Sequence, residues 1–97
     1  MVVKSCSAIA MLEELVGRIV VIALQSPYVC LGTLVRVDDH YVELRNADLH
    51  DLRDSDTNHE NYVAASRATG IKRNRKRVLI KKADMVAISR LADVVER

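Results

Sequence analysis

The sequence predicts a mostly β fold: a five-stranded, strongly bent barrel with an N-terminal helix and a helical insertion between strands 3 and 4. The order of elements, a helix, three strands, a polar helical arm and two short strands, is typical of a small barrel. Gly32 interrupts the longest strand, and a glycine inside a strand usually marks a bulge or a sharp bend. The 97 residues, 49% of them hydrophobic, suffice for one modest core, so residues 1–97 are expected to form a single domain.

The composition argues against several classes of protein. No apolar run approaches the ~20 residues of a membrane-spanning helix, and the amino terminus has no apolar stretch resembling a signal peptide, so we expect a cytoplasmic protein without membrane contact. Cys6 and Cys30 are too few for a disulfide scaffold and lack metal-type spacing. Because neither a glycine-rich phosphate loop nor a Gly-x-Ser-x-Gly motif is present, we expect neither an enzyme nor a bound cofactor.

The first element is a short helix that Ser7 caps and that runs to Val16, because the apolar residues between them recur at helical spacing. Gly17 ends this helix. The segment Arg18–Leu24 is rich in β-branched residues and predicts the first strand. The second strand, Tyr28–Val37, follows a turn that contains a proline.

After a tight turn at Asp38-Asp39, the third strand is predicted over Tyr41–Arg45. Val42 and Leu44 fall on one face of this strand and Tyr41, Glu43 and Arg45 on the other, so one face is expected to be buried.

Residues 47–76 read as an inserted, charged arm. Thr57 and Glu60 have the spacing of a capping box, which predicts a helix over Asn58–Thr69 that Gly70 ends.

Two short strands follow the arm, over Arg77–Lys81 and Met85–Ser89, with a turn at Ala83-Asp84 between them. Residues 91–97 form a short tail.

The charges are sorted along the chain although the net charge is only +2. The balance of charge over residues 38–60 is acidic, whereas residues 61–83 contain no acidic residue. This segregation suits phosphate contact, attraction to the acidic segment of a neighbouring subunit, or simply a solvated loop. The basic residues of the second segment are Arg67, Lys72, Arg73, Arg75, Lys76, Arg77, Lys81 and Lys82.

Two groups of residues form recognisable motifs. The first consists of Leu12, Leu15, Gly17, Val20, Ile22, Leu24, Tyr28, Gly32, Leu34 and Asp38. The second runs from Val78 to Ile88 and has Lys81 and Lys82 at its centre. The first motif resembles the Sm1 pattern, and the second resembles the Sm2 segment, which usually has an Arg-Gly pair at its centre. The chain is thus similar to the Sm-like family of Sm, Lsm and bacterial Hfq ring proteins, and this resemblance implies an Sm-like (SH3-like) barrel.

The resemblance implies RNA contact at the inner rim of a ring. His40 falls on the position that stacks on a base, and an imidazole can both stack and donate a hydrogen bond. Lys81 falls on the arginine position, where it keeps the charge without the planar guanidinium. By their positions in the motifs, Val42 and Lys82 are also counted among the RNA-contacting residues. Val42 replaces the family's asparagine, as in the Hfq branch, and an apolar side chain there cannot read a uracil edge. The family assigns Asp38 to holding the rim loop in shape.

A ring is also expected on physical grounds, because a partly open barrel leaves its last two strands as apolar edges. Pairing of one edge with the other edge of the next subunit is a head-to-tail contact, which closes into a ring when its rotation permits. The family implies six or seven subunits, while the spacing alone neither chooses between these numbers nor excludes a dimer or a pentamer.

A second hypothesis concerns the arm, where imidazoles and carboxylates gather in one short segment. Such groups could ligate a divalent metal, but no recognised spacing is present, and a polar loop is the preferred interpretation. The residues concerned are His50, Asp51, Asp54, Asp56, His59 and Glu60.

The sequence thus predicts an Sm-like ring protein that binds single-stranded RNA with broad or weak sequence selectivity, as a riboregulator or ribonucleoprotein scaffold. The arm would project from one face and carry its basic residues Lys72, Arg73, Arg75, Lys76 and Arg77 to phosphates beyond the pore. The alternative is a ring-forming protein-interaction module that keeps the fold and has lost RNA binding, which the apolar Val42 and the 3% aromatic content favour.

Overall fold

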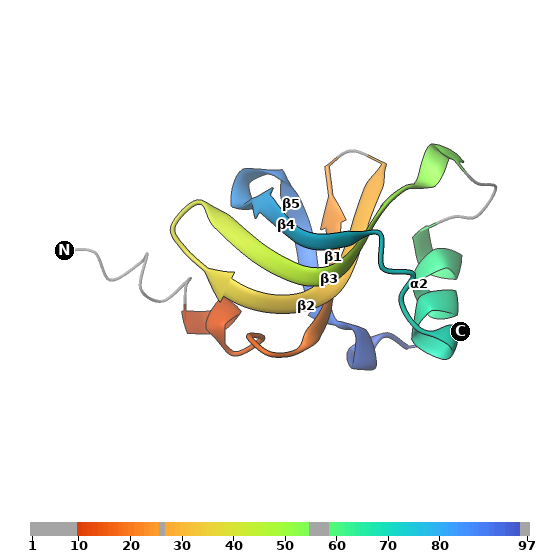
Figure 1. The fold of residues 1–97 in the computed structure, drawn as a ribbon, viewed down its shortest axis with the longest axis horizontal. Coiled ribbons are helices and arrows are strands. Elements are labelled where there is room, and N and C mark those ends of the chain that lie inside the picture. Colours follow the sequence, from red (N-terminus) through yellow and green to blue (C-terminus); the bar gives the residue numbers. More distant parts are fainter. Residues whose placement is uncertain (1–9, 26, 55–58, 96–97) are drawn as a thin grey trace.

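A computed structural model of the chain describes residues 10–25, 27–54 and 59–95. Its centre is one five-stranded antiparallel sheet with the strand order β4-β3-β2-β1-β5, which bends around a core (Figure 1). The connections between β2 and β3 and between β4 and β5 lie at one end of the molecule, and α2 lies at the other. The strands are β1 (Ile19–Leu24), β2 (Tyr28–Val37), β3 (Tyr41–Asp51), β4 (Arg75–Lys81) and β5 (Met85–Arg90).

Short helical segments connect and flank the strands. Residues 10–13 are helical and are followed by turns up to residue 17, while the predicted cap Ser7 lies outside the described residues. Gly17 ends this segment with φ +86° and donates its N–H to the Leu34 carbonyl at 2.7 Å. The other segments are η1 (Leu52–Asp54), α2 (His59–Thr69), η2 (Lys82–Asp84) and η3 (Leu91–Asp93).

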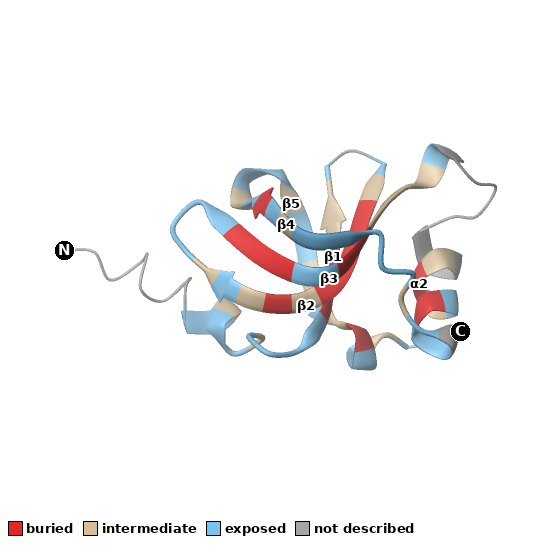
Figure 2. Cartoon of the chain, viewed as in Figure 1, coloured by how far each residue is buried: buried red, intermediate tan, exposed pale blue. Residues whose placement is uncertain are grey.

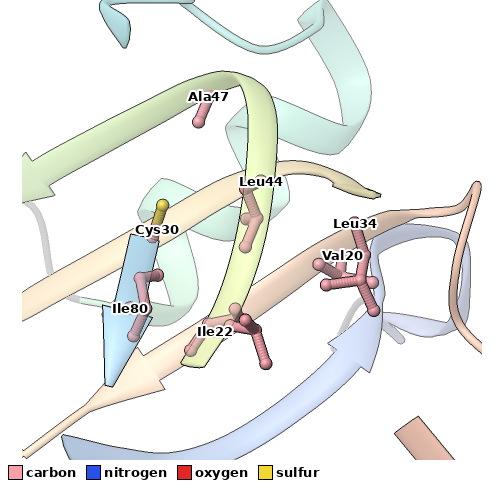
Figure 3. Close-up of a cluster of buried hydrophobic side chains, with 8 residues drawn as sticks. Val20, Ile22, Cys30, Leu34, Leu44, Ala47 and Ile80 are labelled. Atoms are coloured by element: carbon pink, nitrogen blue, oxygen red, sulfur yellow. The ribbon is translucent and has the colours of Figure 1, made fainter. Parts of the chain in front are cut away.

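The core has two parts, one on each side of the sheet. Figure 2 shows buried positions both along the strands and in α2. The part inside the barrel is aliphatic and includes the Cys30 thiol (Figure 3). It consists of Val20, Ile22, Cys30, Leu34, Val42, Leu44, Ala47 and Ile80. Within it Cys30 is a free thiol, and burial followed by the nearby charge of Asp48 raises its pKa to about 12.

The second part of the core lies beneath α2 and η3. Val63 of α2 and Leu91 of η3 are buried there, against the outer side of β1 and β2. Consecutive residues of β1 are therefore buried on both faces. The prediction that the inserted arm projects from the molecule is wrong for this helix, because burial of its apolar side chain holds it on the sheet.

Gly32 brings β2 and β3 unusually close together. A Cβ at this position would lie 2.9 Å from the Ala47 Cβ and 3.2 Å from the Arg45 carbonyl oxygen, distances that only a glycine avoids. The register between the two strands shifts between Leu31 and Thr33. The predicted irregularity at this glycine is confirmed, and it marks the bend of the sheet.

The third strand is longer than predicted, and the arm is correspondingly shorter. β3 continues to Asp51 rather than ending at Arg45, and β4 begins at Arg75 rather than at Arg77. Asn46 adopts φ 52°, which reverses the alternation of side chains so that Ala47 returns to the core. The connection between the two strands therefore spans residues 52–74, and the predicted insertion over 47–76 is corrected at both ends.

No helix among the described residues is long and apolar enough to cross a membrane.

Candidate nucleic-acid interface

Asp38 organises the turn between β2 and β3. Its Oδ1 accepts hydrogen bonds from the backbone N–H groups of His40 at 2.8 Å and Tyr41 at 2.7 Å, and its own N–H donates to the Tyr41 carbonyl at 3.0 Å. The two backbone hydrogen bonds lower the pKa of the Asp38 carboxyl. A carboxylate that stays ionised thus fixes the backbone on which the His40 imidazole is carried.

The turn between β4 and β5 lies directly against this loop. The Lys82 N–H donates a 2.8 Å hydrogen bond to the His40 carbonyl, and Lys81 is paired with Tyr41 across β3 and β4. A shallow pocket of about 390 Å³ forms between the two turns, and Asp39 and Ala83 complete its lining. We call His40, Lys81 and Lys82 the rim site.

The rim site presents one imidazole and two ammonium groups to solvent. His40 and Lys81 are exposed and Lys82 is half-buried. An imidazole offers a flat ring for stacking and a hydrogen-bond donor, and each ammonium offers a point charge for phosphate. This set of groups suits weak, sequence-tolerant contact with a single strand better than recognition of a particular base.

Val42 is not part of the rim site. Its side chain is 0% exposed and packs inside the barrel with Leu44 and Ile80. Its inclusion among the RNA-contacting residues was wrong, because the alternation of β3 points this position into the core.

The remaining basic residues are divided between two places. Lys72 and Arg73 lie in the connection before β4, whereas Arg75, Lys76 and Arg77 belong to β4 itself. Their predicted location on a projecting arm is therefore wrong for the last three. Arg77 forms an ion pair with Glu43 of β3, with 2.9 Å between its Nε and Glu43 Oε2.

No protein-family model matches the sequence, and no curated protein matches it. The fold, however, matches solved structures. The Sm protein of Pyrococcus abyssii, solved in complex with a uridine heptamer, matches 84% of this chain and 93% of its own, with a TM-score of 0.56 and 15% identity. The chain has an Sm-like fold. An Sm-like protein from Archaeoglobus fulgidus matches 82% of this chain and 88% of its own, with a TM-score of 0.56 and 18% identity.

The Sm-like fold predicted from the two motifs is thus confirmed. In this Sm-like chain, the segments that resemble Sm1 and Sm2 meet through the hydrogen bond between Lys82 and His40.

The residues considered for a metal site serve other contacts where the structure describes them. The His50 ring stacks on Tyr62 of α2, with 4.2 Å between ring centroids and 10° between planes. Asp51 pairs with Arg53 at 2.8 Å, and this hydrogen-bonded pairing lowers the pKa of Asp51 to about 2. Asp56 and the side chains of Asp54, His59 and Glu60 lie outside the described part. The described residues contain no group of three or more candidate metal ligands.

Sequence reasoning missed two buried polar groups. Glu43 is 4% exposed and Asp48 is 2% exposed, although both were expected in solvent-facing segments. Glu43 is covered by arginines from three strands, and Asp48 by the connection that follows α2. Because that connection is distant from Asp48 in sequence, no local pattern signals the burial of this carboxyl.

Proposed function

We propose that this Sm-like chain assembles into a homo-oligomeric ring that binds single-stranded RNA with broad or weak sequence selectivity, as a riboregulator or ribonucleoprotein scaffold. The observation that carries the proposal is the junction of the two turns, where the bond between Lys82 and His40 brings the rim site together. The role is one of binding rather than catalysis.

Repetition of the rim site would supply the affinity. One imidazole and two ammonium groups make few contacts, and lysine gives less selectivity than a planar guanidinium. Several copies around one pore act on the same strand at a high effective concentration, so weak individual contacts add up to stable binding.

The two ends of the sheet support assembly into a ring. β4 and β5 are the outer strands of the sheet order, and a hollow of about 600 Å³, lined by both aliphatic and charged side chains, lies beside β4. Leu79 of β4 is 50% exposed and Val86 of β5 is 66% exposed. Pairing of β4 with β5 of the next subunit would cover both, and such a head-to-tail contact repeats until a ring closes.

The alternative is a ring-forming protein-interaction module that has lost RNA binding. The burial of Val42 favours it, because this position offers no polar group to a base. The absence of Phe and Trp also leaves few rings for stacking.

Fluorescence anisotropy of labelled U-rich, A-rich and mixed single-stranded RNAs, at low and moderate salt, separates the two. We expect salt-sensitive binding that His40→Ala and Lys81→Ala each weaken several-fold without a change of assembly mass in light scattering. Arg18→Ala, which removes one exposed charge outside the rim site, is the matched control. An intact ring that binds no RNA at low salt would favour the interaction module.

A parallel test concerns the edges. Leu79→Lys and Val86→Lys should lower the assembly mass, because a charge on an edge strand opposes pairing. Val95→Lys is the control, since Val95 is 81% exposed but lies beyond β5. Unchanged mass in both edge variants would contradict assembly through these strands.

A further inference from the structure

Three arginines surround one carboxylate on the outer side of the sheet. Glu43 lies on the face of β3 that points away from the barrel core, yet it is only 4% exposed. Its Oε1 lies 3.1 Å from Arg36 Nη2, and its Oε2 lies 2.9 Å from Arg77 Nε and 3.4 Å from Arg45 Nε. We call Arg36, Arg45 and Arg77 the arginine face.

The backbone places these three residues on the same side of the sheet. The register between β2 and β3 shifts between Leu34 and Arg36, so that Leu34 faces the core and Arg36 is opposite Glu43. Arg45 and Arg77 are direct partners across β3 and β4. A bulge and a cross-strand pair, contributed by three strands, thus bring the guanidinium groups around one carboxylate.

The arginine face carries more positive charge than the Glu43 carboxylate neutralises. Like charges directly opposite each other in an antiparallel pair are destabilising, and one carboxylate offsets one of three guanidinium charges. The arginine side chains are 69%, 60% and 53% exposed for Arg36, Arg45 and Arg77, so their outer N–H groups reach solvent. The hydrogen bond from Arg77 is the main cause of the lowered pKa of Glu43, so the Glu43 carboxylate stays ionised among the three arginines.

The arginine face continues toward the rim site along the same side of β3 and β4. Glu43 is paired with Leu79, and Tyr41 is paired with Lys81 of the rim site. Tyr41 is exposed, whereas Leu79 is the edge residue that the next subunit would cover. Same-side residues follow one another at about 6.8 Å along a strand, so the path from the rim site leads past Tyr41 and Glu43 to Arg45 and Arg77.

We propose that the arginine face binds the phosphate backbone of single-stranded RNA after it leaves the rim site. Each guanidinium presents a planar fork that matches phosphate oxygens, and Glu43 holds the forks in place before the RNA arrives, which reduces the entropy lost on binding. Tyr41 offers a ring on which a base between the two sites can stack. This inference rests on the proposed function, since it extends the path of the same strand.

A linear arrangement of charge with an exposed aromatic ring favours a nucleic-acid strand over an acidic protein. An acidic segment would be recognised by the same charges but would make no use of the ring or of the continuity with the rim site.

The test compares a uridine heptamer with a U-rich RNA several times longer by fluorescence anisotropy over a range of salt concentrations. The variant carries Arg45→Gln and Arg77→Gln, because glutamine can still donate a hydrogen bond to Glu43. We expect the affinity for the long RNA to fall roughly tenfold or more, since a second point of attachment is removed. The slope of log affinity against log salt should become shallower by about 1.4 or more, at ~0.7 for each phosphate that the variant no longer neutralises. The affinity for the heptamer should fall much less.

The control removes two arginines elsewhere, by Arg18→Gln and Arg53→Gln. Arg53 is a close match, because it also pairs with a carboxylate and is 69% exposed. Arg45→Gln alone, whose ion pair is the longest of the three, tests the same face with the least risk to folding, and thermal melting verifies that each variant is folded.

The possible results separate the two proposals. Loss of long-RNA affinity in the arginine variant but not in the control supports the inference, even where His40→Ala has no effect and the rim site fails. Unchanged long-RNA affinity and salt slope in a folded arginine variant overturn it while leaving the rim site intact. Equal loss of affinity in the control variant would show a non-specific charge effect and would overturn the inference about the arginine face. Absence of RNA binding by the unmodified ring, or binding of poly-glutamate alone, would overturn both this inference and the proposed RNA-binding function.

Discussion

Asn74 binds the buried carboxylate of Asp48 at the point where the connection after α2 rejoins the sheet, with 2.9 Å between Nδ2 and Oδ1. The same side chain accepts the Leu49 N–H at 3.0 Å and donates to the Leu49 carbonyl at 3.1 Å, and the Asn74 N–H donates to the Ala47 carbonyl at 2.9 Å. Burial raises the pKa of Asp48, and within the described part of the chain its Oδ2 has no hydrogen-bond partner. One amide therefore both extends the pairing of β3 and holds an otherwise poorly satisfied carboxyl.

Replacing Asn74 by alanine should destabilise the fold by about 1–3 kcal/mol, because Asp48 Oδ1 would lose its hydrogen bond from Asn74 and both buried carboxylate oxygens would then lack a described partner. Asn74→Asp should be worse, since it places a second carboxylate against the first. Urea unfolding gives the free energy, and faster hydrogen exchange at the Leu49 amide would locate the change. Arg73→Ala, in the same connection and exposed, should have little effect. Equal stabilities for Asn74→Ala and Arg73→Ala would contradict this role.

Gly32→Ala should cost about 1–3 kcal/mol through overpacking, because the new methyl would meet the Ala47 Cβ at 2.9 Å. Ala47→Gly in the same chain removes that clash and should recover part of the stability, although the Arg45 carbonyl at 3.2 Å remains. Thermal or chemical unfolding of the two single variants and the double variant measures the coupling. Additive effects would show that the two positions do not collide.

Val42→Asn restores the residue type that the Sm1 pattern has at this position, but here it should destabilise the barrel by about 1–3 kcal/mol by burying an amide among aliphatic side chains. We expect no gain in selectivity for uridine. Tyr41→Asn, one position earlier and exposed, is the control for stability. A stable Val42→Asn protein with a new preference for uridine over adenosine would return this position to the RNA site.

The protein should lose stability in acid through the four described carboxyls whose pKa values are lowered in the folded state: Asp38, Glu43, Asp51 and Asp93. The ordinary value is 4.5 for Glu43 and 3.8 for the three aspartates, and Asp51 is lowered to about 2. The unfolded chain binds protons first, so the stabilisation is fully present above these ordinary values and is lost as the pH falls through the lowered ones. Urea midpoints measured at decreasing pH test this, and Glu43→Gln should reduce the pH dependence. A flat profile down to about pH 3 would contradict the prediction.

Much of the fold could be predicted from local pattern. The bounds of β2 agree with Tyr28–Val37, and α2 covers the predicted helix from His59 to Thr69, while Thr57 and Asn58 lie outside the described residues. The end of β3 could not be predicted from local pattern, because residues 47–51 have the composition of a polar connection. They form a strand because Asn46 adopts a positive φ and β2 lies alongside them.

The candidate site divides in the same way. The two motifs predict that His40 and Lys81 belong to one inner rim, whereas the hydrogen bond between the Lys82 N–H and the His40 carbonyl is known only from the structure. The shielding of Glu43 depends on a bulge in β2 and on the register with β4, and neither is visible in the residues around Glu43 itself. Long-range pairing, rather than propensity, decides which charges come together.

The burial of Cys30 makes its reactivity a measure of how often the barrel opens transiently. Only the thiolate reacts with alkylating reagents. The Cys30 thiol, which is enclosed in the barrel and has a pKa of about 12, is therefore not alkylated until the strands around it separate. In a chain carrying Cys6→Ser, the labelling rate would therefore count opening events of the barrel. Slower labelling at higher protein concentration would then reveal that neighbouring copies hold the barrel shut.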